Sequence, residues 1–319
     1  MALIDLHAHT TYSDGHDTPS ALVKMAAENK VAVLGVTDHD NLDGLPEAIA
    51  AGKAHGVRIV CGVEITTGFH GQTIHMLGYG VPLDNAEFND FLGKLYRHRK
   101  TLMTQVVEKL NVDFKAAGRQ TVDLDDFISS QGQYFNNEKT AQYLVVNGFL
   151  PEFEPAIHLM FSLSRGGASG VAKHMASSVE AIAAIHKAGG LAILSHPFAA
   201  GTSLRKIDPT SEGQENLLKE MIAAGIDGME CYQSEYGPEE TSFALSLAKK
   251  YDLLASAGSD WHGAICDVPG DMKDRKSFYP EHIGGLGTTS EMIAPLLERL
   301  GLPRGAEAKW GVGKQGDIW

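Results

Sequence analysis

The feature that most constrains the fold is an alternation of short apolar runs with amphipathic stretches. Between most of the apolar runs lie segments such as PSALVKMAAEN and SVEAIAAIHKAGG, which begin near Pro or Ser and end at Gly or Asn, as capped helices do. Alternating strands and helices predict βα units around a largely parallel sheet. Seven predicted strands favour a (β/α) barrel over an open doubly wound sheet: 2–9, 31–39, 57–65, 73–80, 191–197, 228–232 and 253–260.

The alternation is interrupted between residues 85 and 175. The stretch EFNDFLGKLYRHRKTLMTQVVEKLNV is typical of one long helix, shorter helical segments follow it, and the Gly-rich RGGASG leads back to the alternating pattern. We therefore predict a barrel built from residues 1–84 and 176–306, with residues 85–175 as a helical insertion over its mouth. The tail, residues 307–319, has no periodicity and is set apart from both.

Histidines and acidic residues stand at or just past the ends of the predicted strands. His7 and His9 are two residues apart, so on a strand they point to the same face. In a (β/α) barrel the carboxyl ends of the strands converge on one mouth, where active sites lie. Nine residues from distant parts of the chain are therefore expected in one pocket: His7, His9, Asp14, His39, Glu64, His75, His196, Asp260 and His262.

Imidazoles and carboxylates without thiolates form a ligand set for Mn, Fe or Zn. So many ligands exceed the needs of one ion, and the sequence predicts about two to three divalent ions. Asp38 and Asp40 flank His39 and would orient it, although Asp40 would equally serve as the cap of a helix that begins near Leu45. Ser195 is not part of a GxSxG elbow, so a serine nucleophile is not predicted.

Charge and composition limit the partners. The net charge of −13 argues against a broad basic surface for nucleic acid, but it is compatible with a short strand or a nucleotide held at metal ions. No apolar run approaches the ~18 residues that would span a membrane. The three cysteines form no CxxC pair, and the first residues lack a charged segment followed by an apolar one, so we expect a reduced, cytoplasmic protein. The sequence does not indicate an oligomeric state.

Six motifs resemble, in order, those of the PHP (polymerase and histidinol phosphatase) family: DLHAHTTYSDG, GVTDHD, GVEI, HMLGYG, SHP and GSDWHG. They look most like its stand-alone bacterial metal-dependent phosphoesterases, over most of residues 1–80 and 177–265. The resemblance implies a distorted (β/α)7 barrel that holds three metal ions, often manganese. It further implies that the first ion is held by His7, His9, Glu64 and Asp260, that Glu64 bridges to a second held by His75 and His196, and that Asp14, His39 and His262 hold the third.

The resemblance is weaker where a substrate would be chosen. Relatives that hydrolyse nucleotide phosphates often carry an Arg-x-His motif in the inserted helices, where this chain reads Asn137-Glu138-Lys139. Other phosphate-facing cations of those relatives are missing or moved as well. Five cations of this chain would take their place as substrate-binding residues: Arg97, Arg99, Lys139, Arg165 and Lys173.

These observations predict a hydrolase of phosphoric ester bonds that acts on a small phosphorylated molecule, nucleotide-like or another metabolite. A hydroxide that bridges the metal ions would attack the phosphorus. Three alternatives stay open: a 3′–5′ exonuclease for short oligonucleotides, a C–N amidohydrolase, and a metal-binding regulatory domain without activity. Amidohydrolases usually carry a metal-bridging carbamylated lysine, which these strand ends do not offer. The predicted catalytic residues are Glu64, His196, Asp260 and Asp38.

Overall fold

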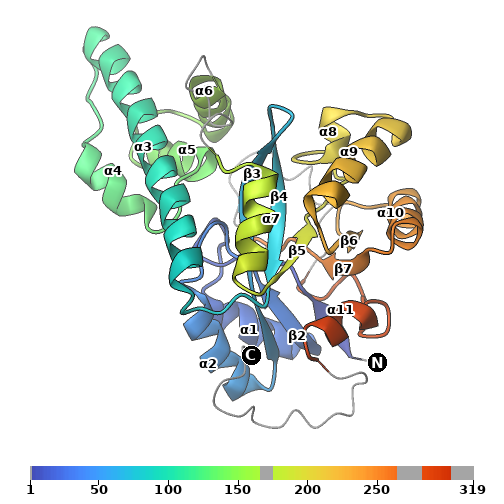
Figure 1. Ribbon diagram of the computed structural model, residues 1–319. Coiled ribbons are helices and arrows are strands. Elements are labelled where there is room, and N and C mark those ends of the chain that lie inside the picture. The colour runs from blue at the N-terminus through green and yellow to red at the C-terminus, as the bar shows by residue number, and fades with distance from the viewer. Residues whose placement is uncertain (1, 166–174, 264–281, 303–319) are drawn as a thin grey trace.

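The computed structural model describes residues 2–165, 175–263 and 282–302. Its centre is a mixed seven-stranded sheet whose strand order follows the chain (Figure 1). Each predicted apolar run coincides with one strand, so the predicted number and position of the strands are confirmed. The strands are β1 (Leu3–Asp5), β2 (Val31–Val36), β3 (Arg58–Phe69), β4 (Gln72–Tyr79), β5 (Leu191–Leu194), β6 (Gly228–Gln233) and β7 (Leu254–Gly258).

Helices between the strands pack on the outer face of this sheet, and capping residues mark where they begin. Thr18 accepts a hydrogen bond from the amide of Ala21, and Pro19 occupies the first helical position. Ser177 and Glu180 form a reciprocal capping box. These helices are α1 (Pro19–Glu28), α2 (Leu45–His55), α7 (Ser178–Lys187), α8 (Leu204–Ile207), α9 (Ser211–Ala224) and α10 (Pro238–Lys250). A further helix, α11 (Ala294–Arg299), follows β7 and packs on the opposite face.

One strand departs from the expected parallel arrangement. β4 runs antiparallel to β3 and to β5, whereas the other neighbouring pairs are parallel. His70 and Gly71 join β3 to β4, with φ angles of 47° and 72°, as in a tight two-residue hairpin turn. Such a short connection cannot return the chain to the start of a parallel strand. An apolar run predicts a strand but not its direction, and the sequence reading missed the reversal.

Among the described strands, β1 and β7 do not form a continuous ladder, so strand pairing does not close the sheet into a barrel. The two edges nevertheless meet just beyond β1. The amide of Leu6 donates to the carbonyl of Ala257 at 3.0 Å, and the amide of His9 donates to that of Trp261 at 2.8 Å. The chain after β1 therefore lies beside the chain at and after β7, at the level where the histidines begin.

Alternate residues of each strand face two different apolar layers. One face packs against the surrounding helices through residues such as Leu34 and Ile59. The opposite face forms an inner core with α11, made of residues such as Ile4, Val33, Val60, Leu77, Ile193, Leu296 and Leu297. By this alternation, Glu64 shares the inner face of β3 with Val60, and His75 shares that of β4 with Leu77.

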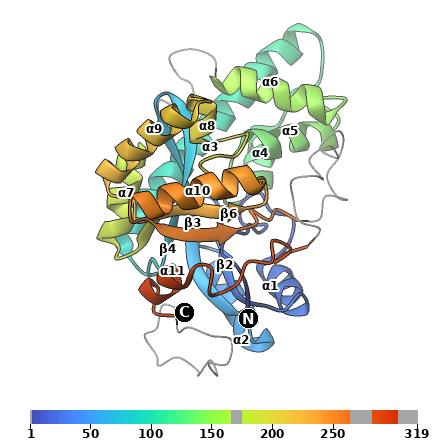
Figure 2. The same cartoon turned by 90° about the vertical axis from the view of Figure 1, so that its right-hand side faces the viewer.

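Four further helices stand beside the sheet (Figures 1 and 2). Phe127, Leu144 and Met160 belong to an apolar core that these helices form among themselves. The first turns of the longest one pack instead into the main core, through Phe88 and Leu92. That this segment is a separate cap that selects substrate stays a prediction, as do the boundaries assigned to it. The four are α3 (Ala86–Ala116), α4 (Leu124–Gln131), α5 (Asn137–Val146) and α6 (Phe153–Arg165).

Of the helices in the described ranges, none combines the length and the apolar character needed to cross a membrane. The predicted C-terminal tail lies outside the described residues.

Candidate metal centre

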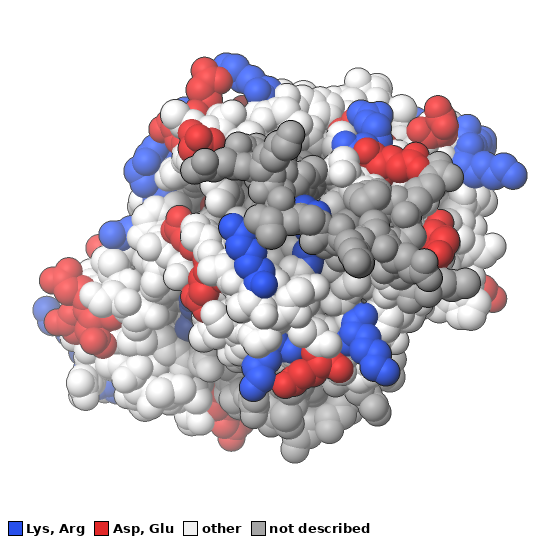
Figure 3. All heavy atoms as spheres, turned by 90° about the horizontal axis from the view of Figure 1, so that it is seen from below, with Lys and Arg blue, Asp and Glu red and all other residues white. Residues whose placement is uncertain are grey.

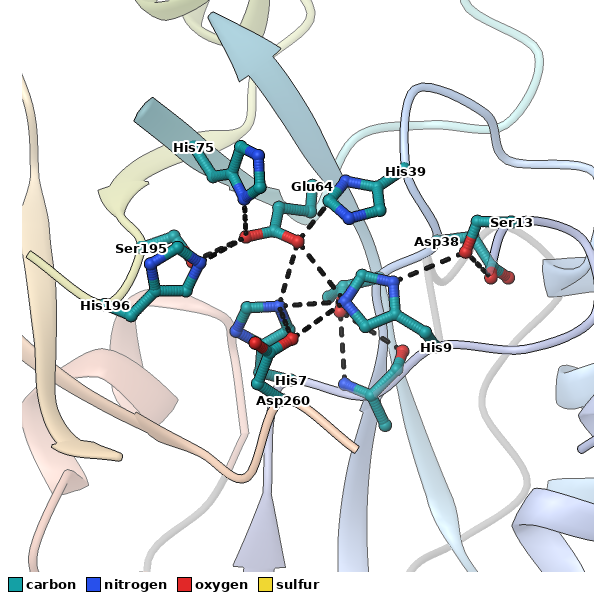
Figure 4. A network of polar contacts seen from close by, with 12 residues as sticks. His7, His9, Ser13, Asp38, His39, Glu64, His75, Ser195, His196 and Asp260 are labelled. Carbon is teal, nitrogen blue, oxygen red and sulfur yellow. Dashed lines mark hydrogen bonds and ion pairs between the residues drawn. The ribbon is translucent and has the colours of Figure 1, made fainter. Parts of the chain in front are cut away.

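Glu64 lies at the middle of a buried polar cluster and is 1% exposed (Figure 4). Its Oε1 lies 3.1 Å from both His75 Nδ1 and His196 Nε2. Its Oε2 lies 3.2 Å from the Nε2 atoms of both His7 and His9. The two oxygens of one carboxylate therefore face two different pairs of imidazoles.

One group of ligand atoms consists of His7, His9, Glu64 and Asp260, all within 4.8 Å of one another. Asp260 Oδ1 lies 3.1 Å from the Nε2 atom of each of the two histidines. This close approach requires a glycine beside it, because a Cβ on Gly258 would lie 2.1 Å from that of His7. The backbone of β7 thereby brings Asp260 to residues that are about 250 positions away in the sequence.

A second group consists of His9, Asp14, His39 and His262, again within 4.8 Å. Asp14 Oδ1 lies 3.4 Å from His262 Nε2, and Asp14 Oδ2 lies 3.7 Å from His39 Nε2. The rings of His9 and His262 stack with centroids 4.2 Å apart. Nδ1 of His262 lies 2.8 Å from the carbonyl of Asp260, which leaves Nε2 to face the group.

A third group consists of His39, Glu64 and His75. His196, which the family resemblance pairs with His75, is not in this group, although it contacts the same oxygen of Glu64. We expected all these residues to lie at the carboxyl ends of strands, but His75 does not. It pairs with Thr66 in the first half of the antiparallel β4 and so enters the site from the opposite chain direction.

Three ligand atoms of these groups are buried without a hydrogen-bond partner: Asp14 Oδ1, His39 Nδ1 and His75 Nδ1. Leaving a buried polar atom unpaired costs about 1–3 kcal/mol. Converging nitrogen and oxygen lone pairs of this kind are satisfied together by a divalent cation, and the absence of thiolates suits Mn, Fe or Zn. The residues present therefore fit divalent metal ions.

The charges of the cluster are set by burial and by mutual pairing. Burial opposes ionisation of Glu64 and Asp260, yet the adjoining histidines hold the pKa of both carboxyls well below the usual range. Burial alone would lower the pKa of His196 and His262, but the carboxylates beside them raise it to about 9 and about 10. For His39, burial prevails over nearby carboxylates and lowers the pKa to about 3. Its neutral ring is the form that can donate a lone pair to a cation.

Sequence reasoning missed Glu230, which is fully buried on β6. Its Oε1 lies 3.1 Å from His7 Nδ1, and its Oε2 accepts a hydrogen bond from the amide of His196 at 2.7 Å. The hydroxyl of Ser195 donates to Oε1 of Glu64 at 2.7 Å and to Glu230 at 3.2 Å, so it joins the two carboxylates and is not set up as a nucleophile. An acidic residue inside the apolar run GMECY was the signal that would have identified Glu230.

Asp38 does not orient His39 through a hydrogen bond in the described structure. Its Oδ1 accepts from the amide of Thr10 at 2.7 Å and from the hydroxyl of Ser13 at 2.6 Å. It thereby fixes the turn that carries Asp14 towards the cluster. Asp38 thus contacts the turn before Asp14, and its predicted catalytic role stays a prediction.

Asp40 is neither a partner of His39 nor a helix cap. The N-cap of α2 is Gly44, which makes no side-chain capping bond. Asp40 instead accepts from the amide of Thr66 at 2.9 Å and from Nε of Arg99 at 2.6 Å. Arg99 is thus already engaged by a carboxylate, and its guanidinium lies 4.6 Å from the centroid of the Tyr134 ring.

The side chains of two of the other predicted substrate-binding cations are described, and both contact groups of the protein itself. Arg97 is exposed, with its Nη2 3.7 Å from Asp90. Nζ of Lys139 donates to the carbonyls of Ser13 at 3.0 Å and of Gln131 at 2.9 Å, so it serves the protein backbone. The side chain of Arg165 and the whole of Lys173 lie outside the described residues.

Three residues at the site adopt left-handed backbone conformations that residues other than glycine rarely adopt. The φ angles are 29° for His196, 56° for Asp260 and 53° for Asp40. Such conformations persist only where surrounding contacts hold them, and they gather at functional sites. In each case the turn follows a strand and redirects the side chain.

Comparison with known proteins agrees with this architecture. A family model described as the PHP domain matches residues 5–139. The chain is 31% identical over 262 residues to a 5'-3' exoribonuclease of Haemophilus influenzae, which covers 81% of this chain and 89% of the relative. It is 30% identical over 266 residues to the 3',5'-nucleoside bisphosphate phosphatase of Chromobacterium violaceum, which covers 82% of this chain and 88% of the relative.

Among solved structures, a protein of Bifidobacterium adolescentis proposed to be a metal-dependent phosphoesterase matches with a TM-score of 0.72. The identity is 27%, and the match covers 92% of this chain and 95% of that one. The fold and the site together define a metal-dependent hydrolase of phosphoric ester bonds. The chain belongs to the PHP domain family.

Proposed function

We propose that the natural substrate is a small phosphorylated molecule, with a nucleotide-like one favoured, and that manganese is the preferred ion. The observation that carries this proposal is the position of Glu64 between two pairs of imidazoles. A carboxylate that faces two ligand groups is suited to hold two cations at a short separation, as in phosphoryl transfer at paired metals.

In this proposal the three overlapping groups of ligand atoms, with His196 beside the third, hold about two to three ions per chain. Bound divalent ions would acidify a water molecule and offset the charge on the oxygens of a phosphate ester. The protein contributes fixed positions for those ions through buried side chains. The first ion is assigned to His7, His9, Glu64 and Asp260, the second to Glu64, His75 and His196, and the third to Asp14, His39 and His262.

The names of two relatives support a nucleotide-like substrate, since one is a nucleoside bisphosphate phosphatase and the other an exoribonuclease. The second relative also favours a second candidate function, the removal of nucleotides from short RNA. That relative is named as a 5'-3' enzyme, opposite to the 3′–5′ direction that we expected for an exonuclease. Both functions would use the same metal site.

The charge of the molecule favours small substrates over long nucleic acid. The net charge is −13. On the face seen in Figure 3, the described Lys and Arg side chains are interspersed with Asp and Glu and form no continuous basic patch. A broad non-specific grip on a polyanion needs such a patch. Substrate would therefore be recognised mainly at the metal ions.

The remaining alternatives have less support. No lysine is among the buried charged residues in the described part of the chain, whereas many amidohydrolases bridge their metals with one. A regulatory domain without activity would not need three overlapping ligand groups, two of which share Glu64.

The deciding experiment is a substrate screen with the full chain and added Mn²⁺. We expect hydrolysis of a nucleoside 3′,5′-bisphosphate or of a short 5′-phosphorylated RNA, detected as released phosphate or mononucleotide. Chelation should abolish it, Mn²⁺ should restore it, and His7→Ala should remove it. The control His70→Ala changes an exposed histidine that pairs with Glu220, and this variant should keep activity. Elemental analysis giving one metal equivalent or fewer in active protein would refute the multinuclear site.

A further inference from the structure

The loop between α4 and α5 brings the inserted helices into contact with the ligand group of Asp14 and His39. Asn136, at the end of this loop, is the N-cap of α5, where its Oδ1 accepts from the amide of Lys139 at 2.7 Å. Its Nδ2 donates to Oδ2 of Asp14 at 3.0 Å. Both ends of one amide are thus engaged, and the cap requires the oxygen to face the helix. The nitrogen is therefore the atom that faces Asp14.

This contact holds the Asp14 carboxylate in one orientation, in which Oδ2 also lies 3.7 Å from His39 Nε2. With Oδ2 held by Asn136, Oδ1 is left buried and without a hydrogen-bond partner. Oδ1 lies 3.4 Å from His262 Nε2 and 3.7 Å from His9 Nδ1. A carboxylate free to rotate would spend part of its time with neither oxygen aimed at the other ligands.

Two neighbours of Asn136 hold the same group. The ring of Tyr134 stacks on that of His39 with centroids 5.1 Å apart and an interplanar angle of 12°, and Tyr134 is 5% exposed. Nζ of Lys139 donates to the carbonyl of Ser13, the residue before Asp14. Residues 134, 136 and 139 therefore contact two of the four ligands, Asp14 and His39, or the residue that precedes Asp14.

We infer that Asn136 is a positioning residue for the ion assigned to Asp14, His39 and His262, and that the inserted helices thereby control retention of this ion. The inference rests on the proposed metal site and adds to it a role for the insertion besides substrate selection. Ligand side chains held by outer contacts bind metal about 10–100-fold more tightly than unsupported ones.

The test must separate positioning of Asp14 from capping of α5. Asn136→Ser keeps a good N-cap, because a serine hydroxyl accepts from the same amide, but it is too short to reach Asp14. Asn136→Ala removes both interactions. Asn85→Ala is the matched control, because Asn85 caps α3 through the amide of Phe88 at 3.0 Å and, within the described structure, does not contact the cluster.

The readout is a titration of metal-free protein with Mn²⁺, followed by electron paramagnetic resonance, together with the thermal midpoint. We expect Asn136→Ser to keep a near-normal midpoint and to weaken the binding of one ion about tenfold or more. Asn85→Ala should lower the midpoint and leave the titration unchanged.

Normal binding of every ion by Asn136→Ser would overturn the inference while leaving the proposed function intact. Equal weakening in Asn85→Ala would assign the effect to loss of a cap and overturn it too. A wild-type chain that binds one ion or none would remove the proposed multinuclear site and this inference with it.

Discussion

Two buried glutamates, Glu64 and Glu230, organise the site at the scale of single residues. The oxygens of Glu64 face imidazoles on both sides, and those of Glu230 bind His7 and the backbone of His196 from behind. A buried carboxylate is costly unless it is paired, so neither position would keep an acid in a purely apolar core. The two differ in position. Glu64 points to where ions would bind, whereas Glu230 contacts His7 and the backbone of His196 on the side away from that space.

For Glu64→Gln we expect a folded protein that binds about one metal equivalent less. The volume is kept, but the charge that would hold two cations together is lost. The rate constant kcat should fall about a thousandfold or more, equivalent to ~4 kcal/mol of barrier. Elemental analysis and steady-state kinetics measure both effects, with Glu220→Gln at an exposed position as the control. Full metal content with near-normal turnover would show that Glu64 does not bridge.

For Glu230→Gln we expect weaker metal binding without loss of the fold. An amide has one acceptor oxygen, so it cannot serve both His7 Nδ1 and the amide of His196 as the carboxylate does. Loss of such a supporting contact typically weakens metal binding about 10–100-fold. A Mn²⁺ titration against Glu239→Gln, an exposed position on α10, measures it. Equal affinities in the two variants would assign Glu230 to packing alone.

At the scale of elements, the site depends on how α3 is tied to the loop after β2. Arg99 on α3 binds Asp40, and Asp40 in turn accepts from the amide of Thr66 on β3. Asp40 is 4% exposed, so it needs these partners. One arginine thereby links the inserted helices to two segments of the sheet that carry ligands.

Arg99→Ala should therefore destabilise the protein, whereas Arg97→Ala, two residues away and 64% exposed at its side chain, should not. Removing one member of a buried ion pair leaves the other without compensation, at a cost on the order of 2 kcal/mol here. A thermal midpoint lowered by several degrees for Arg99→Ala only is the expected result. If Arg99 also contacts substrate, its variant will raise KM at unchanged metal content. Indistinguishable midpoints for the two variants would mean that the Arg99–Asp40 pair contributes little.

At the scale of the whole molecule, two histidines of the cluster are protonated when no metal is bound. His196 and His262, with pKa values of about 9 and about 10, are protonated at pH 7.5. A histidine must lose its proton from the ligating nitrogen before that nitrogen can bind a cation. Metal binding and proton release are therefore linked.

We expect metal binding at pH 7.5 to release at least about one proton per chain, and apparent affinity to rise with pH. Calorimetric Mn²⁺ titrations in buffers of different ionisation enthalpy measure the number. The folding stability of the metal-free protein depends on pH in the opposite direction, because it falls as pH rises. Because the folded pKa values are raised, stability from these histidines is present below about pH 6.5 and is lost as pH rises through about 9 to 10. Buffer-independent heats of binding would contradict the linkage.

The sequence alone located the strands of this protein and most of the residues of its proposed metal site. Burial of a strand requires a short apolar run, and that requirement is local, so all seven strands could be located. The pairs and motifs around His7, Glu64 and Asp260 stand directly at such runs, which made them recognisable one by one.

Only the tertiary structure decided direction, pairing and support. The reversal at β4 depends on two turn residues, and it brings His75 into the site from the opposite chain direction. Glu230 contacts His7 and Asn136 contacts Asp14, each more than 100 residues away, and no local pattern records these two pairings. Spacing predicts which face a side chain takes, whereas the partner it finds there depends on how distant segments pack. That packing turned Lys139 and Arg99, expected to bind substrate, towards the protein itself.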